Sequence, residues 1–534
     1  MSGIEQALVL LLLLAGLSVL AGRLPWPAPI TYATGGCLIS LWPAFPAIQL
    51  DPDFFFLFFV PPLLFADGWL MPLRDFWSVR RPVLTLATGL VVVTTLAVGF
   101  AAHWLIPGLP LAMAFALGAV ISPTDAVAVG VITQKLRVPP RLTAVLNGES
   151  LMNDATGLVA FKFALAAAAA GSFSLGRASV SFLVVALGGL VLGLAISWAV
   201  GKLRDVLQRV HGMDPLLETT ISLLTPFAAY LAAGPLGVSN ILAVVAAGLY
   251  AGWRDPLRMD ASTRQMAWRV WSLLLFWLNG LAFILLGLQL PAILGSLQAQ
   301  FTTGQLLLFT AAVSGTAILM RLLWFGPGTL LSYRIFRRGL RGETPPPRSW
   351  LAVASWAGMR GTITLAAALS IPVLMDDGTP FPGRDLVIFL AAGTIVVTLL
   401  LQGTTLEALI CKLKVQPGDT HLEEERLARI AAVEAGLEYL RSEERDEEGE
   451  SAALGEIIAE YEYRLAELTA EGETRSHARC RRRLARVHRL GALRAERAAL
   501  DQLWSAHRIS DEIHRPLQHL LDFEEAMLEG GKEG

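Results

Sequence analysis

Apolar runs of about 20 residues, the length that crosses the hydrocarbon core of a bilayer, follow one another through the first 405 positions of this chain. Of its 534 residues, 54% are hydrophobic and only 16% are charged. A soluble protein carries about 25% charged residues. The sequence therefore predicts an all-α, polytopic membrane protein.

Hydropathy divides this region into about 13 predicted transmembrane helices. They cover residues 4–22, 28–43, 52–71, 82–106, 111–132, 143–170, 177–201, 214–234, 237–252, 266–290, 302–326, 349–374 and 385–405. The first run has no basic segment before it and leads directly into more spans. We therefore expect it to be a transmembrane helix and not a cleaved signal.

The basic residues of the loops predict the orientation of the spans. Loops after odd-numbered spans contain Arg23, Arg74, Arg80, Arg81, Lys135, Arg137, Arg141, Lys202, Arg204, Arg209, Arg254, Arg258, Arg264, Arg334, Arg337, Arg338 and Arg341. Loops after even-numbered spans contain only Arg177 and Arg384. Because basic loops stay in the cytoplasm, we expect the N-terminus outside and the C-terminus inside.

The chain changes character near residue 415. Residues 1–410 form the predicted transmembrane domain, whereas residues 415–534 are rich in charge, Ala and Leu with a helical period. They predict a cytoplasmic tail of two to four helices. The tail is interpreted as solvated helices packed on each other, with a regulatory or dimerising role as the alternative.

The segment ISPTDAVAVG places a proline and a carboxylate inside an apolar span. Pro123 removes a backbone donor and breaks the helix, and irregular backbone at membrane depth lines a cavity or is buried in protein. The freed carbonyls, the Thr124 hydroxyl and the Asp125 carboxylate are oxygen ligands that suit a hard cation. The alternative is a packing kink with a shielded aspartate.

The segment NGESLMNDATG carries two further carboxylates inside a span. Ser150 and Asp154 lie four residues apart and share one helix face, while Glu149 and Asn153 share a neighbouring face. The first face can offer a hydroxyl and a carboxylate to an ion. The second can hold a buried ion pair or hydrogen bond that fixes the helix.

Two arginines and one more aspartate also fall within spans, where a charge costs several kcal/mol unless it is paired or hydrated. Arg360 lies between Gly358 and Gly361, and Glu149 is its expected partner. For Arg321, snorkelling toward the cytoplasm is the alternative to a structural role. Asp67, after a double proline, is interpreted either as a third site carboxylate or as an interfacial residue.

Taken in this order, SPTDAVAV, NGESLMNDATGLVAF and GMRGTITLAAAL resemble the bacterial NhaP-type sodium/proton antiporters. These belong to the first monovalent cation/proton antiporter family, together with the eukaryotic sodium/proton exchangers. The resemblance covers about residues 5–410. It implies inverted repeats, a homodimer, and two discontinuous helices that cross near the membrane midplane, the second around Arg360.

The resemblance also implies roles for individual residues. Cation and proton ligands are expected at Asp125, Asp154, Thr124 and Ser150, with Asn153 in the Asn-Asp pair and Glu149–Arg360 as a buried ion pair. In many relatives the acid of the third span directly follows a Phe. Here Ala66 holds that place, and Asp67 comes one residue later.

These observations predict a secondary transporter that exchanges Na⁺, or Li⁺, for H⁺ in pH and sodium homeostasis at a bacterial inner (plasma) membrane. Burial and like charge favour the protonated carboxyl, so a proton and a cation compete for Asp154 and Asp125. Relatives with two adjacent aspartates at the Asn-Asp position resemble electrogenic exchangers. Asn153 cannot ionise, so the resemblance implies electroneutral 1:1 exchange. No cofactor and no nucleic-acid partner is expected.

Two other classes of function stay open. One is a K⁺/H⁺ antiporter or a proton-coupled carrier of another solute on the same scaffold, since oxygen ligands alone do not select among monovalent cations. The other is an intramembrane aspartyl protease, against which stands the absence of a G-x-G-D element in the sequence.

Overall fold

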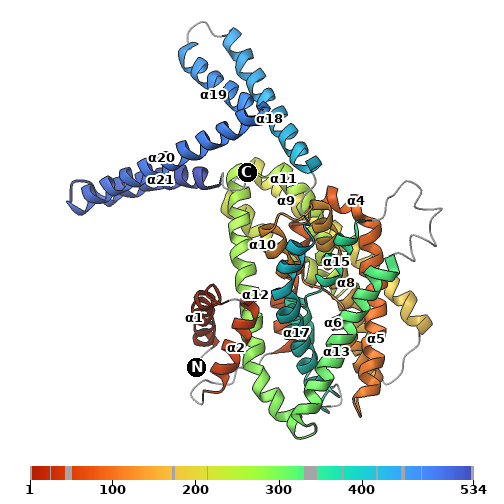
Figure 1. Ribbon diagram of the computed structural model, residues 1–534. Helices are drawn as coiled ribbons and strands as arrows, with labels where there is room; N and C mark the ends of the chain where they lie inside the picture. The colour runs from red at the N-terminus through yellow and green to blue at the C-terminus, as the bar shows by residue number, and fades with distance from the viewer. Residues whose placement is uncertain are drawn as a thin grey trace, which may run out of the picture. The chain divides into compact units, whose positions relative to one another are not determined.

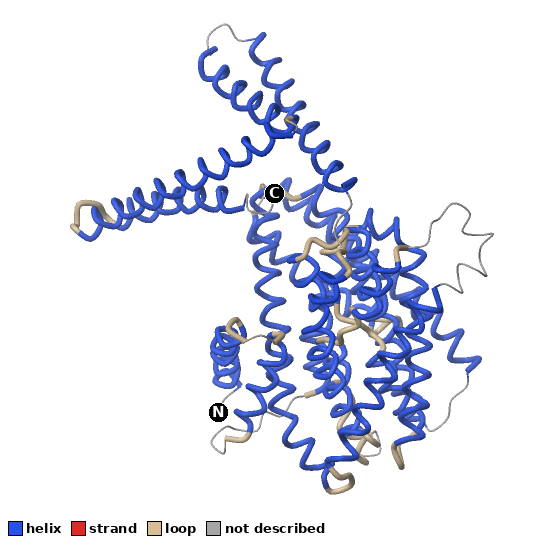
Figure 2. Tube along the Cα trace, in the orientation of Figure 1, coloured by secondary structure: helices blue, strands red, loops and turns tan. Residues whose placement is uncertain are grey.

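The computed structural model describes residues 3–24, 26–42, 51–170, 175–212, 214–329, 346–375, 378–415, 419–446, 451–470 and 472–530. Within these ranges the regular secondary structure is helical (Figure 2), as the sequence predicts. The chain forms two compact units, Met1–Gln416 and Pro417–Gly534.

The second unit consists of two helical hairpins in its described residues. Helix α18 (Asp419–Asp446) packs on α19 (Ser451–Thr469), and α20 (Gly472–Ser505) packs on α21 (Asp511–Gly530). Arg497 on α20 forms ion pairs of 2.6 Å with Asp522 and 2.6 Å with Glu525 on α21. These contacts tie the second hairpin together.

Every span predicted from hydropathy overlaps a helix of the first unit (Figure 1). The helices are α1 (Gly3–Ala21), α2 (Ala28–Ser40), α3 (Pro52–Trp69), α4 (Leu73–Leu84), η1 (Thr85–Leu90), α5 (Val91–Leu105), α6 (Leu111–Ile121), α7 (Ala126–Lys135), α8 (Pro140–Ala170), α9 (Leu175–His211), α10 (Pro215–Ala233), α11 (Asn240–Arg258), α12 (Ala261–Gln298), α13 (Thr303–Leu323), η2 (Trp324–Gly328), α15 (Arg348–Trp356), α16 (Thr362–Leu369) and α17 (Arg384–Lys412). Among the described residues, seven helices are long and apolar enough to cross a membrane.

Several helices continue past the predicted span ends, so basic residues predicted for loops lie on helices. Arg204 lies on α9 and is 3% exposed. Its Nη1 donates to Asp255 Oδ1 at 2.8 Å, and its Nε donates to Glu218. The expectation that Arg204 belongs to a cytoplasmic loop is wrong, because partners on α10 and α11 satisfy its charge inside the protein.

The first unit contains two groups of helices. The scaffold bundle comprises α1–α3 and α9–α12, in which α12 packs on α2 and α11 packs on α9 and α3. The core bundle comprises α4–α8, α13 and α15–α17, in which α6 packs on α5 and α8, and α13 packs on α5 and α17. In the scaffold bundle, a Cβ added to Gly287 would lie 2.1 Å from the Ala33 carbonyl oxygen, so α2 and α12 need glycine where they meet.

Two helices of the core bundle are interrupted, and their interruptions meet. The first break separates α6 from α7 at residues 122–125, and the second separates α15 from α16 at residues 357–361. The Asp125 N–H donates to the Met359 carbonyl at 2.8 Å, which joins the breaks directly. Pro123 explains the first break, because it has no N–H to continue the helix. The prediction of a second break around Arg360 is confirmed.

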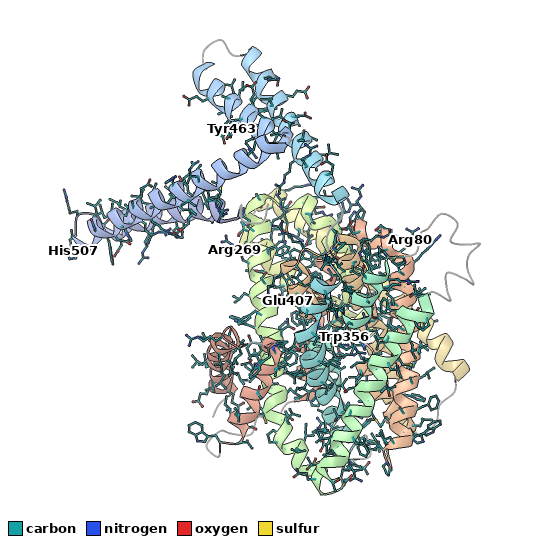
Figure 3. All side chains as sticks on the ribbon, viewed as in Figure 1. Arg80, Arg269, Trp356, Glu407, Tyr463 and His507 are labelled. Carbon is teal, nitrogen blue, oxygen red and sulfur yellow. The ribbon has the colours of Figure 1, made fainter. Side chains whose placement is uncertain are left out.

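Both broken helices are also tied to α17. Trp356 Nε1 donates to Thr405 Oγ1 at 2.8 Å, and Lys135 Nζ pairs with Glu407 Oε1 at 2.8 Å. Trp356 and Glu407 are labelled in Figure 3, where both lie among the helices of the first unit. Helix α17 thus holds one half-helix of each interrupted helix.

Candidate functional site

A cavity of about 30 Å³ lies where the two breaks face the scaffold bundle. Its lining residues from the core bundle are Thr124, Asp125, Ser150, Asp154, Gly361, Thr362, Ile363 and Thr364. Those from the scaffold bundle are Leu63, Asp67, Leu275 and Asn279. A water molecule needs roughly 10–15 Å³ of such space, so the cavity has room for a small ion or about two waters.

Three carboxylates of the cavity wall come from three different elements. Asp154 on α8 is 4% exposed, whereas Asp67 on α3 and Asp125 at the first break are partly buried. In the described part of the chain, the Asp67 and Asp154 carboxylates accept no hydrogen bond. Carboxylates buried in this way need a proton or a cation to offset their charge.

Asp125 is fixed at the meeting point of the two breaks. Its Oδ1 accepts a hydrogen bond from the Ala128 N–H at 3.4 Å, at the start of α7. A Cβ added to Gly361 would lie 1.7 Å from Asp125 Oδ2, so the backbone that begins α16 passes directly beside this carboxylate. Helix N-termini carry partial positive charge, which favours an anionic group at this place.

Ser150 and Asn153 hold the unwound segment of the first break in place. Ser150 Oγ donates to the Thr124 carbonyl at 2.7 Å and accepts from the Ala126 N–H at 3.1 Å. Asn153 Nδ2 donates to Thr124 Oγ1 at 3.0 Å. The sequence predicts Ser150 and Thr124 as ion ligands, and both lie in the cavity wall. Their polar groups also form the hydrogen bonds that stabilise the break.

Arg360 donates hydrogen bonds to backbone carbonyls at the C-terminal ends of α6 and α15. Its Nε donates to the Ile121 carbonyl at 2.9 Å, at the end of α6, and its Nη1 donates to the Gly358 carbonyl. Its backbone N–H donates to Thr398 Oγ1 at 3.3 Å. A cation beside two helix C-termini offsets their partial negative charge, so Arg360 and Asp125 stabilise the two pairs of helix ends separately.

The buried ion pair joins Glu149 to Arg321, and the expectation that Glu149 pairs with Arg360 is wrong. Arg321 Nη2 lies 3.0 Å from Glu149 Oε2, and Nη1 bonds Oε1 of the same carboxylate. Arg321 Nε also donates to the Ala354 carbonyl at 3.1 Å. At 1% exposure, Arg321 does not snorkel. Arg360 is already occupied by the carbonyls of the breaks.

A hydrogen bond between two uncharged residues of the cavity wall is absent from the sequence prediction. Thr362, the first residue of α16, donates from Oγ1 to Asn279 Oδ1 at 2.6 Å, and Asn279 Nδ2 donates to the Leu275 carbonyl at 2.9 Å. The only sequence signal is one amide within the apolar run FWLNGLAFILL. Burial of an amide costs far less free energy than burial of a charge, so a single amide in an apolar run does not by itself indicate a functional site.

Residues 9–412 match the family described as sodium/hydrogen exchanger, transmembrane. The chain belongs to this family. It is 39% identical to the uncharacterized Na(+)/H(+) exchanger YjcE of Escherichia coli (strain K12), over 94% of each chain. It is 37% identical to the sodium, potassium, lithium and rubidium/H(+) antiporter of Bacillus subtilis (strain 168), over 96% of this chain and 76% of the relative.

Among solved structures, the fold is similar to the sodium proton antiporter MjNhaP1 from Methanocaldococcus jannaschii, with a TM-score of 0.60 at 20% identity. The match covers 77% of this chain and 99% of the other. Membership of the sodium/hydrogen exchanger family makes the chain an NhaP-type cation/proton antiporter and not an enzyme. It is a multi-pass membrane protein with bacterial relatives.

Proposed function

We propose that the chain exchanges Na⁺ for H⁺ at the cavity between the two bundles, with Asp154 and Asp125 as the principal ligands and Asp67 as the third. The observation that carries this proposal is the convergence of three carboxylates on a space of about 30 Å³. Hydroxyl oxygens of Thr124 and Ser150 lie in the same wall, and hard monovalent cations are bound by such oxygens.

Competition between the two ions follows from the burial of the site. A carboxylate in a poorly hydrated space is stable only when a proton or a cation offsets its charge. Asp154 is the most deeply buried of the three carboxylates and has no donor among the described residues. It therefore holds either a proton or Na⁺, and exposing it alternately to the two sides of the membrane exchanges one for the other.

The proposed stoichiometry is one proton per cation, so that transport is electroneutral. Asn153, next to Asp154, cannot ionise, and Glu149 is neutralised by Arg321. Neither adds a titratable charge to the transported state. A membrane potential applied across vesicles, with no chemical gradient of either ion, should then drive no net exchange. Net exchange under the potential alone would exclude this stoichiometry.

Potassium is the second candidate for the transported cation, because the name of the Bacillus subtilis relative includes potassium, lithium and rubidium beside sodium. Carboxylate and hydroxyl oxygens bind all of these ions, and cavity size decides among them.

We further propose that the protein has 13 spans in inverted repeats, an external N-terminus and a cytoplasmic tail, and that it forms a homodimer. In a bacterium, the inward proton gradient then expels Na⁺.

Purified protein in liposomes with an acidic interior and a pH-sensitive dye tests the proposal. Addition of Na⁺, Li⁺ or K⁺ outside should restore the dye signal for the wild type, and the most effective ion identifies the substrate. Asp154→Asn should abolish the recovery. If no cation restores the signal in wild-type vesicles, the proposed exchange is wrong and another solute must be sought.

A further inference from the structure

We propose that Asn279 is a positioning residue whose hydrogen bond with Thr362 latches the core bundle to the scaffold bundle at the cation cavity. This inference rests on the proposed function, because it assumes alternating exposure of the site. Asn279 belongs to α12 of the scaffold bundle, and Thr362 belongs to α16 of the core bundle. Their side-chain oxygens lie 2.6 Å apart in the cavity wall.

The scaffold end of this bond is rigid. Asn279 Nδ2 is held by the Leu275 carbonyl of its own helix at 2.9 Å, which turns Oδ1 toward Thr362. The next residue, Gly280, packs against Leu14, since a Cβ added there would lie 2.2 Å from its side chain. Asn279 is therefore fixed to the scaffold bundle and cannot follow a moving core.

On the core side of the bond, Thr362 lies one residue from the backbone that contacts the proposed cation ligand Asp125. Thr362 directly follows Gly361, whose backbone passes beside the Asp125 carboxylate. Met359, two residues before Gly361, accepts the Asp125 N–H at 2.8 Å. A hydrogen bond that fixes Thr362 thus also fixes the unwound backbone segment that contacts Asp125.

Alternating access moves one bundle against the other around the binding site. The Asn279–Thr362 bond joins the two bundles at that site, so it must break when they move. The bond stabilises the conformation described here relative to the alternate one. Its loss should shift the equilibrium toward the alternate conformation by roughly threefold to tenfold, the effect of one ordinary hydrogen bond.

The shift has a signature that a direct cation ligand would not give. The apparent affinity of a carrier for a cation on one side of the membrane decreases when fewer molecules expose the site to that side. Removing the latch therefore raises the cation KM at the membrane face open in this conformation and lowers it at the opposite face. Removing a cation ligand raises the KM at both faces.

The experiment measures the cation KM in right-side-out and in everted membrane vesicles. Thr362→Val removes the hydroxyl at nearly constant shape, and Asn279→Ala removes the acceptor. We expect each variant to shift the two KM values in opposite directions, by roughly threefold to tenfold in total. The double variant should match either single one. Thr362→Ser, which keeps the hydroxyl, should restore both values.

Thr316→Val is the matched control, because among the described residues Thr316 Oγ1 bonds only the Ala312 carbonyl of its own helix, at 2.7 Å. It should leave both KM values unchanged. Equal increases of KM at both faces for Asn279→Ala would make Asn279 a cation ligand and overturn the proposal, as would two unchanged values. If the wild type exchanges no cation, the proposed function fails. Non-additive thermal midpoints of Thr362→Val and Asn279→Ala would then still show whether the bond exists.

Discussion

Nη2 of Arg321 lies 3.0 Å from Oε2 of Glu149, and both side chains are at most 1% exposed. The pair joins α13 to α8 inside the core bundle. Because Arg321 neutralises Glu149, this carboxylate is not available to a transported ion. The carboxylates that face the cavity are then those of Asp67, Asp125 and Asp154.

Breaking the Glu149–Arg321 pair should destabilise the protein strongly. Removal of one partner of a buried ion pair costs about 3–5 kcal/mol, since the other charge stays buried alone. We expect Glu149→Gln and Arg321→Gln each to lower the thermal midpoint of the purified protein by many degrees. The pair between Arg441 and Glu462 is about half exposed and serves as the control. Arg441→Gln should lower the free energy of unfolding by less than about 1 kcal/mol. Equal effects of the buried and exposed variants would contradict the structural role of the buried pair.

Asp67→Asn should weaken cation binding without unfolding the protein. Loss of one charged partner typically costs about 1.5–3 kcal/mol, so the cation KM should rise at least tenfold. Transport in proteoliposomes at a series of Na⁺ concentrations measures this value. An unchanged KM would show that Asp67 lines the cavity without binding the cation.

Gly361→Ala should abolish transport or reduce it by more than about tenfold, because the new methyl group would overlap the Asp125 carboxylate. The same substitution at Gly315 on α13 has nothing within 4 Å of the added Cβ. Gly315→Ala should transport like the wild type. Initial rates of both variants at matched protein density give the comparison, and normal transport by Gly361→Ala would show that the two breaks are less tightly packed than described.

The pH dependence of the cation KM should report the number of protons displaced. Protonated site carboxyls must release a proton before the cation binds, so the KM should rise as the pH falls. For one proton per cation the rise approaches about tenfold per pH unit on the acidic side. A limiting slope of two protons per cation would contradict the electroneutral 1:1 exchange.

The carboxylates of the site could be predicted from the sequence, because a charge inside an apolar span is costly and therefore conspicuous. Asp125 and Asp154 were identified in this way, and the proline beside Asp125 indicated the broken helix. The partner of Glu149 could not be predicted. Arg321 and Arg360 are both arginines in apolar spans, and the choice between them depends on how helices far apart in sequence pack.

Two further features escaped prediction for related reasons. Asn279 is uncharged, and one amide in an apolar run does not distinguish a cavity residue from a packing residue. Arg204 lies near the predicted end of a span, where basic residues usually belong to loops. Its buried partners, Glu218 and Asp255, come from helices that only the folded structure brings beside it.

Arg360, Asp125 and Ser150 satisfy the ends and the unwound backbone of the broken helices with groups of the protein itself. The interruptions therefore do not require a bound ion, and groups of the protein itself hold the proposed cation ligands in place. In the proposed function, an ion that enters finds its ligands already in place, so little of its binding energy is spent on ordering them. In the proposed exchange, the return of the carrier with a proton, after the cation has left, then begins from an intact site.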